Sequence, residues 1–453
     1  MMARDCLALI LAAGEGTRMR SSLPKVMHRV AGRPMLHHVI SVSKEAGCSQ
    51  IAVVAGTGFE LVTSFVEGIA PDARIFEQKE RLGTGHAVLS ARDALEAGSD
   101  DILVLFGDTP LLQPETLKKM RTHLSDGASV VVLGFEADNP DGYGRLLESE
   151  GKLLAIREHK DASPKEREVT FCNGGIMGLS GAHALELLDA ITNENANGEY
   201  YLTDVVEIAN ARGLSVVAIK ADESEVMGVN TRKGLADVEA IWQRQRRQMF
   251  MAAGVSIQAP ETVFFDVDTF VEPDTIIEPN VVFGPGVHVK RGARIRAFSH
   301  LEGASVGEDA EVGPYARLRP GAALESGSKV GNFVEIKNAS LGAGAKVNHL
   351  TYVGDAEIGP AANIGAGTIT CNYDGMNKHK TIIGANAFIG SNSSLVAPVT
   401  IGDGAYVASG SVVTEDVPAE GMAVGRGRQV NKEGYGAKIR ARNARLKEER
   451  AKG

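Results

Sequence analysis

Residues 277–301 read IEPNVVFGPGVHVKRGARIRAFSHL, and in this stretch an apolar residue returns every six positions, at Ile277, Phe283, Val289, Ile295 and Leu301. After short steps of five the same period continues through Val306, Val312, Leu318, Leu324, Val330, Ile336, Leu341, Val347, Val353, Ile358 and Ile364, and after an interruption through Ile383, Ile389, Leu395, Ile401, Val407 and Val413. Six residues do not match the 3.6-residue period of an α-helix. They are typical of a parallel β-helix in which three hexapeptides make one triangular coil. We expect a left-handed parallel β-helix of hexapeptide repeats.

The first half of the chain has a different pattern. Residues 1–230 contain 23 glycines, whereas the 127 residues of 284–410 contain 21. Short apolar runs at 7–12, 51–55, 102–106, 129–133 and 214–219 indicate strands, and the patterns at 35–46 and 87–95 indicate helices between them. Strands that alternate with helices predict a mostly parallel, Rossmann-like sheet covered on both faces. The fold class is therefore α/β plus all-β.

These patterns divide the chain into three parts. Residues 1–230 form a predicted α/β domain, 231–252 a linker helix with Leu235, Val238, Ile241 and Trp242 on one face, and 253–453 the β-helix with a basic tail. The segment TCNYDGMNKHKT at 370–381 breaks the six-residue period, so we expect it to project from the coil as a loop. Loops held by a rigid scaffold are favoured places for chemistry.

Composition excludes several classes of protein. The 453 residues are 43% hydrophobic and 23% charged, as in ordinary globular chains. No run of about 18 apolar residues occurs, so we expect no membrane span, and the apolar start is interpreted as a buried strand rather than a signal peptide. One Trp and 5% aromatic residues argue against a nucleic-acid stacking surface. Four scattered cysteines, Cys6, Cys48, Cys172 and Cys371, are typical of the reducing cytoplasm.

Charge is unevenly distributed along the chain. The net charge is −9, but residues 424–453 hold ten Lys or Arg and three Glu, which leaves −16 on the rest. A basic tail on an acidic body either binds an anionic partner or is a solvated terminus.

A glycine-rich turn follows the first predicted strand. It reads Leu11-Ala12-Ala13-Gly14-Glu15-Gly16-Thr17-Arg18, and Pro24-Lys25 follows a few residues later. Glycines at a strand end let backbone N–H groups approach a phosphate chain, and Arg18 and Lys25 add two positive charges. The combination resembles the signature of nucleotidyltransferases that make nucleoside-diphosphate sugars.

Other polar residues lie at predicted strand ends of the same domain. Asp108, in Phe106-Gly107-Asp108, and Asn230 supply hard oxygen ligands suited to Mg²⁺, although either residue could instead stabilise a turn. Gln78, Gly83 and Thr84 are candidates for binding a base. Gly144, Glu158 and Asn173 are candidates for binding a sugar.

A second set of polar residues stands out against the apolar period of the β-helix. Its members are Arg319, Lys337, His349, Tyr352, Asn363, Asn372, Tyr373 and Lys378. The cations could hold a phosphate, and a neutral imidazole at His349 could serve as a general base near neutral pH. Cys371 adjoins this set, but attack of an amine on a thioester requires no covalent intermediate, so we assign it no catalytic role.

Nearly the whole chain resembles the bacterial family of bifunctional N-acetylglucosamine-1-phosphate uridyltransferases and glucosamine-1-phosphate acetyltransferases. The resemblance is carried by the nucleotidyltransferase motif and by NHLTYVGDAEIG and NIGAGTITCNYDG on the β-helix. It implies acetylation of glucosamine-1-phosphate with acetyl-CoA, followed by uridylyl transfer from UTP with Mg²⁺. It also implies a cytoplasmic homotrimer, assembled through residues 255–425, that binds small-molecule substrates and neither nucleic acid nor membrane.

The resemblance also implies roles for individual residues. The nucleotide-sugar site would contain Leu11, Ala12, Ala13, Gly14, Arg18, Lys25, Gln78, Gly83, Thr84, Phe106, Gly107, Asp108, Gly144, Glu158, Asn173 and Asn230, with Asp108 and Asn230 as metal ligands. The acetyl-transfer site would bind sugar phosphate through Arg319, Lys337, Tyr352, Asn363 and Lys378, with His349 as the base. Acetyl-CoA would contact Ala366, Asn372, Tyr373, Ser391, Ser409 and Arg426.

Two other hypotheses fit parts of the sequence. The chain could be a nucleotidyltransferase of single activity whose β-helix only assembles subunits or binds an effector. It could also be a trimeric binding scaffold with a degenerate first half. The loop at 370–381 and the polar group around His349 argue against the first hypothesis, and the intact glycine-rich motif with Lys25 and Asp108 argues against the second.

Overall fold

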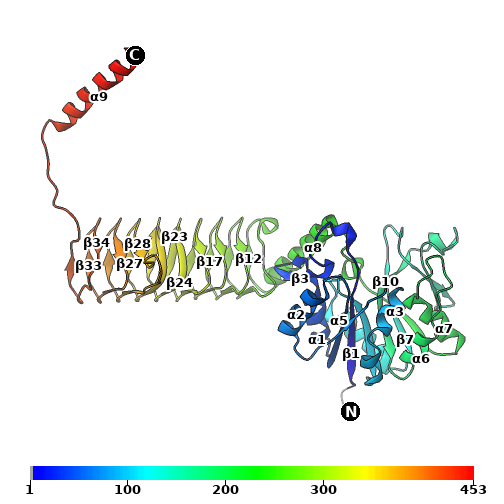
Figure 1. The fold of residues 1–453 in the computed structure, drawn as a ribbon. Helices are drawn as coiled ribbons and strands as arrows, with labels where there is room; N and C mark the ends of the chain where they lie inside the picture. Colours follow the sequence, from blue (N-terminus) through cyan, green and yellow to red (C-terminus); the bar gives the residue numbers. More distant parts are fainter. Residues whose placement is uncertain (1–3, 453) are drawn as a thin grey trace. The chain divides into compact units, whose positions relative to one another are not determined.

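The computed structural model describes residues 4–452 and divides into two compact units (Figure 1). The first unit contains the described residues up to Met249 together with Phe265–Val267. The second contains Phe250–Phe264 and the described residues from Asp268 onward. Every helix among the described residues is too short or too polar to cross a lipid bilayer.

The first unit is built on one mixed sheet with the strand order β11-β7-β10-β6-β1-β4-β5. Its strands are β1 (Cys6–Ala12), β4 (Gln50–Ala55), β5 (Arg74–Glu77), β6 (Asp101–Phe106), β7 (Val130–Glu136), β8 (Arg145–Ser149), β9 (Lys152–Arg157), β10 (Phe171–Ser180) and β11 (Val216–Lys220), and β2 (Arg29–Val30) pairs separately with β3 (Arg33–Pro34). The pairs β1–β4, β1–β6, β4–β5 and β7–β11 are parallel, whereas β10 runs antiparallel to both β6 and β7. The mostly parallel Rossmann-like sheet expected from the alternating pattern is confirmed.

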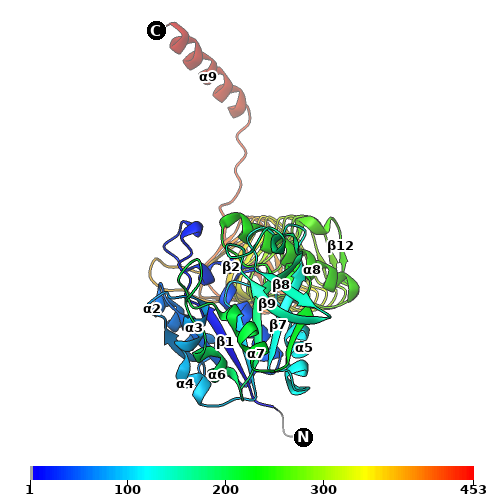
Figure 2. The ribbon, with the colours of Figure 1, turned by 90° about the vertical axis from the view of Figure 1, so that its right-hand side faces the viewer.

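Helices cover both faces of this sheet (Figures 1 and 2). One face packs against α1 (Met35–Glu45), α2 (Phe59–Ile69) and α5 (Pro114–Ser125), and the other against α3 (Thr84–Leu89), α4 (Arg92–Glu96), α6 (Ala184–Asp189) and α7 (Val205–Ala211). Successive residues of β1 alternate between the two cores because side chains of a strand point to opposite faces. The unit also contains most of α8 (Arg232–Ala252).

The single helix expected at 87–95 is two short helices, α3 and α4. The break falls at Ala91, which is fully buried and has a non-helical backbone with φ −101° and ψ 29°. Beside it, the Ser90 hydroxyl donates to the carbonyl of His86, a side-chain bond that competes with regular helix geometry. Periodicity predicts the buried face but not this interruption.

The second unit is a parallel β-helix of short strands stacked coil upon coil (Figure 1). One sheet contains β12 (Ser256–Ile257), β14 (Ile276–Ile277), β17 (Arg294–Ile295), β20 (Glu311–Val312), β23 (Lys329–Asn332), β25 (Lys346–His349), β27 (Asn363–Ile364), β30 (Phe388–Ile389), β33 (Tyr406–Val407) and β35 (Met422–Ala423). The other contains β13 (Phe270–Val271), β15 (Val282–Phe283), β16 (His288–Val289), β18 (His300–Leu301), β19 (Ala304–Val306), β21 (Arg317–Leu318), β22 (Ala322–Leu324), β24 (Glu335–Leu341), β26 (Tyr352–Ile358), β28 (Ile369–Cys371), β29 (Thr381–Ile383), β31 (Ser394–Val396), β32 (Val399–Ile401) and β34 (Val412–Val413).

The periodic residues of the sequence form three buried columns along the coil. The first column is Ile277, Ile295, Val312, Val330, Val347, Ile364, Ile389 and Val407. The second is Val271, Val289, Val306, Leu324, Leu341, Ile358, Ile383 and Ile401. The third is Phe283, Leu301, Leu318, Ile336, Val353, Thr370, Leu395 and Val413. The three-sided coil expected from the six-residue period is confirmed.

Thr370 is a polar member of the third column. It is 2% exposed, and its hydroxyl donates to the carbonyl of Gly354 at 3.1 Å while it accepts from the Gly354 N–H at 2.8 Å. The strand β28 continues to Cys371 and β29 begins at Thr381, so the projecting loop spans 372–380. We call residues 372–380 the projecting loop. Farther along, residues 424–451 are all exposed, and they include most of α9 (Tyr435–Lys452).

A partly buried carboxylate precedes α7 in the first unit. Burial, and after it the neighbouring carboxylates of Glu207 and Glu158, raise the pKa of Asp204 from 3.8 to about 6. Between these two values the folded chain keeps a proton on Asp204 that the unfolded chain has released. The free energy of unfolding therefore falls as the pH rises through this window. Above about pH 6 the whole of this loss of stability remains.

We expect Asp204→Asn to raise the melting temperature above pH 6, because an amide cannot ionise. The difference in melting temperature between the variant and the wild type should decrease as the pH falls from about 6 toward about 4. Thermal unfolding followed by circular dichroism across this range tests the expectation, with the exposed Asp72→Asn as a matched control. A margin that does not change with pH would contradict it.

Candidate active sites

The carboxyl ends of parallel strands bring distant parts of the first unit together. Gly107, just after β6, donates its N–H to the carbonyl of Leu11 at 2.9 Å, and Gln78, just after β5, donates to Ala55 at 2.9 Å. A cavity of about 270 Å³ lies at this edge of the sheet and is lined by Leu11, Ala12, Ala13, Gly14, Lys25, Val26, Gln78, Arg81, Gly83, Thr84, Ala87, Phe106, Asp108 and Glu199. Parallel sheets bind their ligands at the carboxyl ends of the strands, and most of the predicted nucleotide-site residues meet at this edge.

Lys25 connects the glycine-rich turn to the two predicted metal ligands. Gly16 has a φ of +63°, and a Cβ there would lie 2.7 Å from the Cβ of Lys25, so the second glycine of the motif lets the lysine pass close to the turn. The Lys25 ammonium contacts the Asp108 carboxylate and lies 3.2 Å from the Asn230 side-chain oxygen. The oxygens of Asp108 and Asn230, far apart in sequence, therefore converge on one positive charge.

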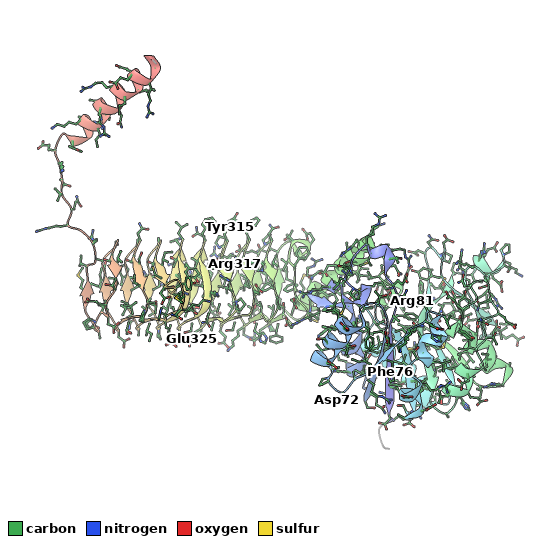
Figure 3. The ribbon with its side chains drawn as sticks, viewed as in Figure 1. Asp72, Phe76, Arg81, Tyr315, Arg317 and Glu325 are labelled. Carbon is green, nitrogen blue, oxygen red and sulfur yellow. The ribbon has the colours of Figure 1, made fainter. Side chains whose placement is uncertain are left out.

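The side of the cavity near α3 is held by side-chain hydrogen bonds. The Gln78 amide donates to the carbonyl of Gly83 at 3.3 Å, and the Thr84 hydroxyl accepts from the N–H of Leu202 at 3.0 Å. Sequence reasoning missed Arg81 and Glu199, which line the same cavity. Arg81 forms an ion pair with Glu15 of the glycine-rich turn and is labelled in Figure 3.

Arg18 has a different environment from the rest of the motif. Its side chain is exposed on the short 3₁₀ helix Thr17–Met19, outside the lining of the cavity.

The three predicted sugar-binding residues form one group. The Asn173 N–H donates to the carbonyl of Gly144 at 2.8 Å, and a Cβ on Gly144 would lie 3.5 Å from both Asn173 and Glu158. Burial raises the pKa of Glu158, a hydrogen bond from the Thr203 hydroxyl opposes the rise, and Asp161 adds to it. Sequence reasoning missed Thr203, which directs the Glu158 carboxylate.

In the second unit, Asn332 orients His349. These residues are direct neighbours in adjacent coils, and His349 Nδ1 lies 2.6 Å from the side-chain oxygen of Asn332. An amide oxygen only accepts hydrogen bonds, so Nδ1 carries a proton, and in the neutral ring Nε2 has the lone pair that a base requires. Sequence reasoning missed Asn332, although it precedes His349 by 17 residues, the length of one coil between Val330 and Val347.

Cations gather where the third side of the coil ends. Arg319 and Lys337 directly follow the third-column residues Leu318 and Ile336, and Arg319 pairs with Glu335 at 2.8 Å. Lys378, from the projecting loop, lies close enough to lower the pKa of Lys337, and Arg319 lowers it further. Neighbouring ammonium groups have the charge that a dianion such as a phosphate requires.

Tyr352 lies over the backbone of the same side. A Cβ on Gly354 would be 2.4 Å from the tyrosine hydroxyl, so only glycine at this position leaves room for the ring.

Several predicted acetyl-CoA contacts follow one corner of the coil. The carbonyl of His349 accepts from Gly367, that of Ala366 from Asn392 and that of Ser391 from Gly410, which places His349, Ala366, Ser391 and Ser409 at equivalent positions of successive coils. Arg426 reaches within 3.8 Å of where a Cβ on Gly410 would lie. Asn372 and Tyr373 belong instead to the base of the projecting loop.

The predicted acetyl-transfer residues of one chain occupy different sides of the coil. Asn363 directly precedes Ile364 of the first column, and His349 lies at the end of that side, two residues after Val347. Lys337 follows Ile336 of the third column. One chain therefore distributes these residues over two sides of its triangular cross-section.

Comparison with known proteins covers both units. Residues 8–162 match the family described as the MobA-like NTP transferase domain, and residues 380–415 match the family described as bacterial transferase hexapeptide (six repeats). The protein named bifunctional protein GlmU from Bartonella quintana is 56% identical over 97% of this chain and 98% of its own length. Proteins of that name from Azorhizobium caulinodans and from a Chelativorans species are each 59% identical, over 99% and 100% of this chain and 100% and 99% of their own lengths.

These relatives span both units at 56% to 59% identity, and the two matched families fall one on the α/β unit and one on the parallel β-helix. The chain belongs to the family of the bifunctional protein GlmU.

Proposed function

We propose that this chain catalyses two consecutive transfers in the synthesis of UDP-N-acetylglucosamine. Glucosamine-1-phosphate is first acetylated with acetyl-CoA, and the product then receives UMP from UTP with release of pyrophosphate. The observation that carries the proposal is that each unit of this one chain holds its own cluster of converging polar side chains, around Lys25 and around Lys337. We assign uridylyl transfer to residues 1–230, acetyl transfer to 253–453, and the connection to 231–252.

In uridylyl transfer the phosphate oxygen of the sugar attacks the α-phosphorus of UTP and the bond to pyrophosphate breaks. The protein supplies position and charge rather than covalent chemistry. Lys25 is the ammonium at the centre of the site, backbone N–H groups of residues 11–14 face the phosphates, and Gly144, Glu158 and Asn173 hold the sugar. Gln78, Gly83 and Thr84 bind the base.

Asp108 and Asn230 fit a magnesium ion. A carboxylate and an amide oxygen are hard ligands, and their oxygens already converge on a positive charge, the Lys25 ammonium. Both residues would hold the ion from the edge of the sheet at which Lys25 lies. When bound, Mg²⁺ neutralises the charge that develops on the phosphates.

In acetyl transfer the amine of the sugar attacks the thioester carbonyl of acetyl-CoA, a C–N bond forms, and the C–S bond breaks to release CoA. His349 Nε2 takes the proton of the amine, because Asn332 keeps the other ring nitrogen protonated. Arg319, Lys337 and Lys378 bind the sugar phosphate, with Tyr352 and Asn363 beside it. Ala366, Asn372, Tyr373, Ser391, Ser409 and Arg426 contact acetyl-CoA.

A homotrimer brings together the residues that one chain separates. Asn363 lies on the first side of the coil and Lys337 on the third, so copies packed side by side place one chain's cations against another chain's Asn363. An apolar ladder along one corner, made of Phe298, Tyr315, Phe333 and Leu350, supports this packing. Tyr315 is labelled in Figure 3.

The ladder is exposed in the single chain. Its members are 48% to 62% exposed, and the rings stack at centroid distances of 4.9 and 5.2 Å. All four have a positive φ, which is unfavourable for large side chains, and exposed apolar patches of this kind mark interfaces. A second copy of the chain is the occupant that also completes the acetyl-transfer site.

We place both reactions in the cytoplasm. The four cysteines are scattered along the chain, and Cys6 and Cys48 are buried side by side with their sulfurs 3.2 Å apart. A reducing compartment keeps such a pair reduced.

Incubation of the protein with glucosamine-1-phosphate, acetyl-CoA, UTP and Mg²⁺, with products identified by mass, tests the proposal. We expect N-acetylglucosamine-1-phosphate, UDP-N-acetylglucosamine, CoA and pyrophosphate. If only externally supplied N-acetylglucosamine-1-phosphate is converted, the chain is a nucleotidyltransferase of single activity.

We expect Asp108→Asn to remove most uridylyl transfer, because a neutral amide replaces the charged oxygen ligand. Acetyl transfer should stay at the wild-type level, since aminolysis of a thioester needs no metal. Both rates are measured on the same preparation. Equal loss of the two activities in a folded variant would refute the assignment of separate sites.

We expect His349→Ala to lower the turnover of acetyl transfer about a hundred- to ten-thousand-fold, the usual cost of losing a general base. Partial recovery at higher pH should follow, because more of the amine is then free. Asn332→Ala should lower turnover less and leave the KM for glucosamine-1-phosphate nearly unchanged. Uridylyl transfer is the control, and a His349→Ala enzyme that keeps about a third of its acetyl transfer at neutral pH would remove His349 from the mechanism.

We expect light scattering to give three times the 47.9 kDa mass of the chain. Phe333→Asp should dissociate the trimer and abolish acetyl transfer while uridylyl transfer persists, because it introduces a charge into the centre of the ladder. Phe270→Asp, at an exposed aromatic residue outside the ladder, is the matched control. A monomer with full acetyl transfer would overturn the shared site.

A further inference from the structure

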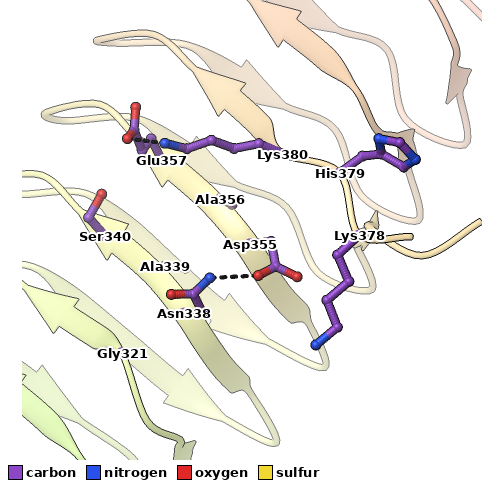
Figure 4. A pocket seen from close by; sticks show the side chains of 10 residues that line it. All are labelled: Gly321, Asn338, Ala339, Ser340, Asp355, Ala356, Glu357, Lys378, His379 and Lys380. Carbon is purple, nitrogen blue, oxygen red and sulfur yellow. Dashed lines mark hydrogen bonds and ion pairs between the residues drawn. The ribbon is translucent and has the colours of Figure 1, made fainter. Parts of the chain in front are cut away.

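A chain of three side chains crosses successive coils at the base of the projecting loop. Asn338, Asp355 and Asn372 are spaced by 17 residues and lie where the third side of the coil turns into the second. The Asn338 amide donates to one oxygen of the Asp355 carboxylate at 2.6 Å, and the buried Asn372 amide donates to the other oxygen. Figure 4 shows Asn338 and Asp355 facing each other on neighbouring strands, with Lys378 beside them.

Asn372 is also the residue at which the projecting loop closes. Its carbonyl accepts from the N–H of His379 at 2.8 Å, and Tyr373 and Lys378 form an antiparallel bridge just beyond. At the tip, the Asp374 carboxylate accepts from the N–H groups of Met376 and Asn377. The loop is therefore a small hairpin with internal bonds, and the Asn372 side chain ties its base to the coil through Asp355.

Asp355 also places a negative charge near Lys337 and Lys378. Burial disfavours its ionised form, but hydrogen bonds from Asn338 and Asn372 and the nearby Lys378 and Lys337 outweigh this cost and hold its pKa below the ordinary value. The carboxylate thus offsets the repulsion between two lysines that approach each other closely enough to interact. The hydrogen bond of Asp355 to Asn372 and the negative charge of Asp355 therefore have the same effect. Both keep Lys378 near Lys337.

We propose that Asp355 is a positioning residue of acetyl transfer, which holds the projecting loop so that Asn372 and Lys378 meet the substrates. The inference rests on the proposed acetyl-transfer function. Asp355 acts through Asn372 and Lys378, and it is not itself a catalytic residue. Misplacing a substrate-holding group by about 1 Å can cost on the order of a hundredfold in rate.

The substitution Asp355→Asn breaks the chain of hydrogen bonds, and a second substitution, Asn338→Asp, restores it. In Asp355→Asn, the new amide can accept from one neighbour only and directs its own N–H groups at the other. Adding Asn338→Asp supplies an acceptor for those N–H groups, so the order of donors and acceptors is again satisfied up to Asn372. Glu308→Gln is the matched control, since Glu308 is an exposed carboxylate of the coil that lies outside the projecting loop.

We expect Asp355→Asn to lower kcat/KM for acetyl transfer about ten- to a hundredfold, mainly through higher KM values for glucosamine-1-phosphate and acetyl-CoA. The double variant Asp355→Asn/Asn338→Asp should recover most of the loss, whereas Glu308→Gln should keep wild-type kinetics. Uridylyl transfer should not change in any of them. Unchanged acetyl transfer in Asp355→Asn, or no recovery in the double variant, would overturn the proposal.

Limited digestion with trypsin tests the loop without reference to activity. Release of the loop in Asp355→Asn should speed cleavage after Lys378, and the double variant should slow it again, as measured by mass spectrometry of the fragments. Equal cleavage of wild type and Asp355→Asn would overturn the proposal. A wild-type enzyme that does not acetylate its substrate refutes the proposed function instead, and the digestion still decides whether Asp355 holds the loop.

Discussion

Burial of one aliphatic side chain every six residues is the constraint on which the second unit depends. Each coil places three such residues inside, as Val347, Val353 and Ile358 do, and burial of this apolar surface stabilises the stack. Because most coils outside the one with the projecting loop are 17 or 18 residues long, polar side chains one coil apart meet at the same corner. The bonds from His349 to Asn332 and from Asn338 to Asp355 both follow from this repeat.

In the first unit, polar side chains from distant segments come together in a different way. Its parallel strands end at one edge of the sheet, so side chains that follow β1, β5 and β6 come together without any repeat in the sequence. The turn after β1 needs the left-handed conformation of Gly16 to let Lys25 pass, and Lys25 then contacts Asp108. Two unrelated scaffolds thus present groups of cations and oxygens, and one chain combines them.

Much of this arrangement follows from pattern alone. The three buried columns, the alternation of β1 between two cores, and the meeting of Leu11, Lys25, Gln78 and Asp108 are predictable because periodicity and strand ends obey simple geometric rules. The split of the helix expected at 87–95 is not predictable in this way, since it depends on how Ala91 packs beneath its neighbours. The partners Thr203 and Asn332 were missed because neither belongs to a chemical motif.

The sequence by itself determined the two architectures, the order of the units and the residue types available for chemistry, because local period and composition carry that information. Only the tertiary structure decided which oxygen faces Lys25, which nitrogen of His349 keeps its lone pair, and that Asp355 joins Asn338 to Asn372. Those relations depend on side-chain direction and on contacts between segments far apart in the chain. A hydrogen bond requires a donor–acceptor distance that is correct to within a few tenths of an ångström. The packed coils and the sheet hold both partners with this precision.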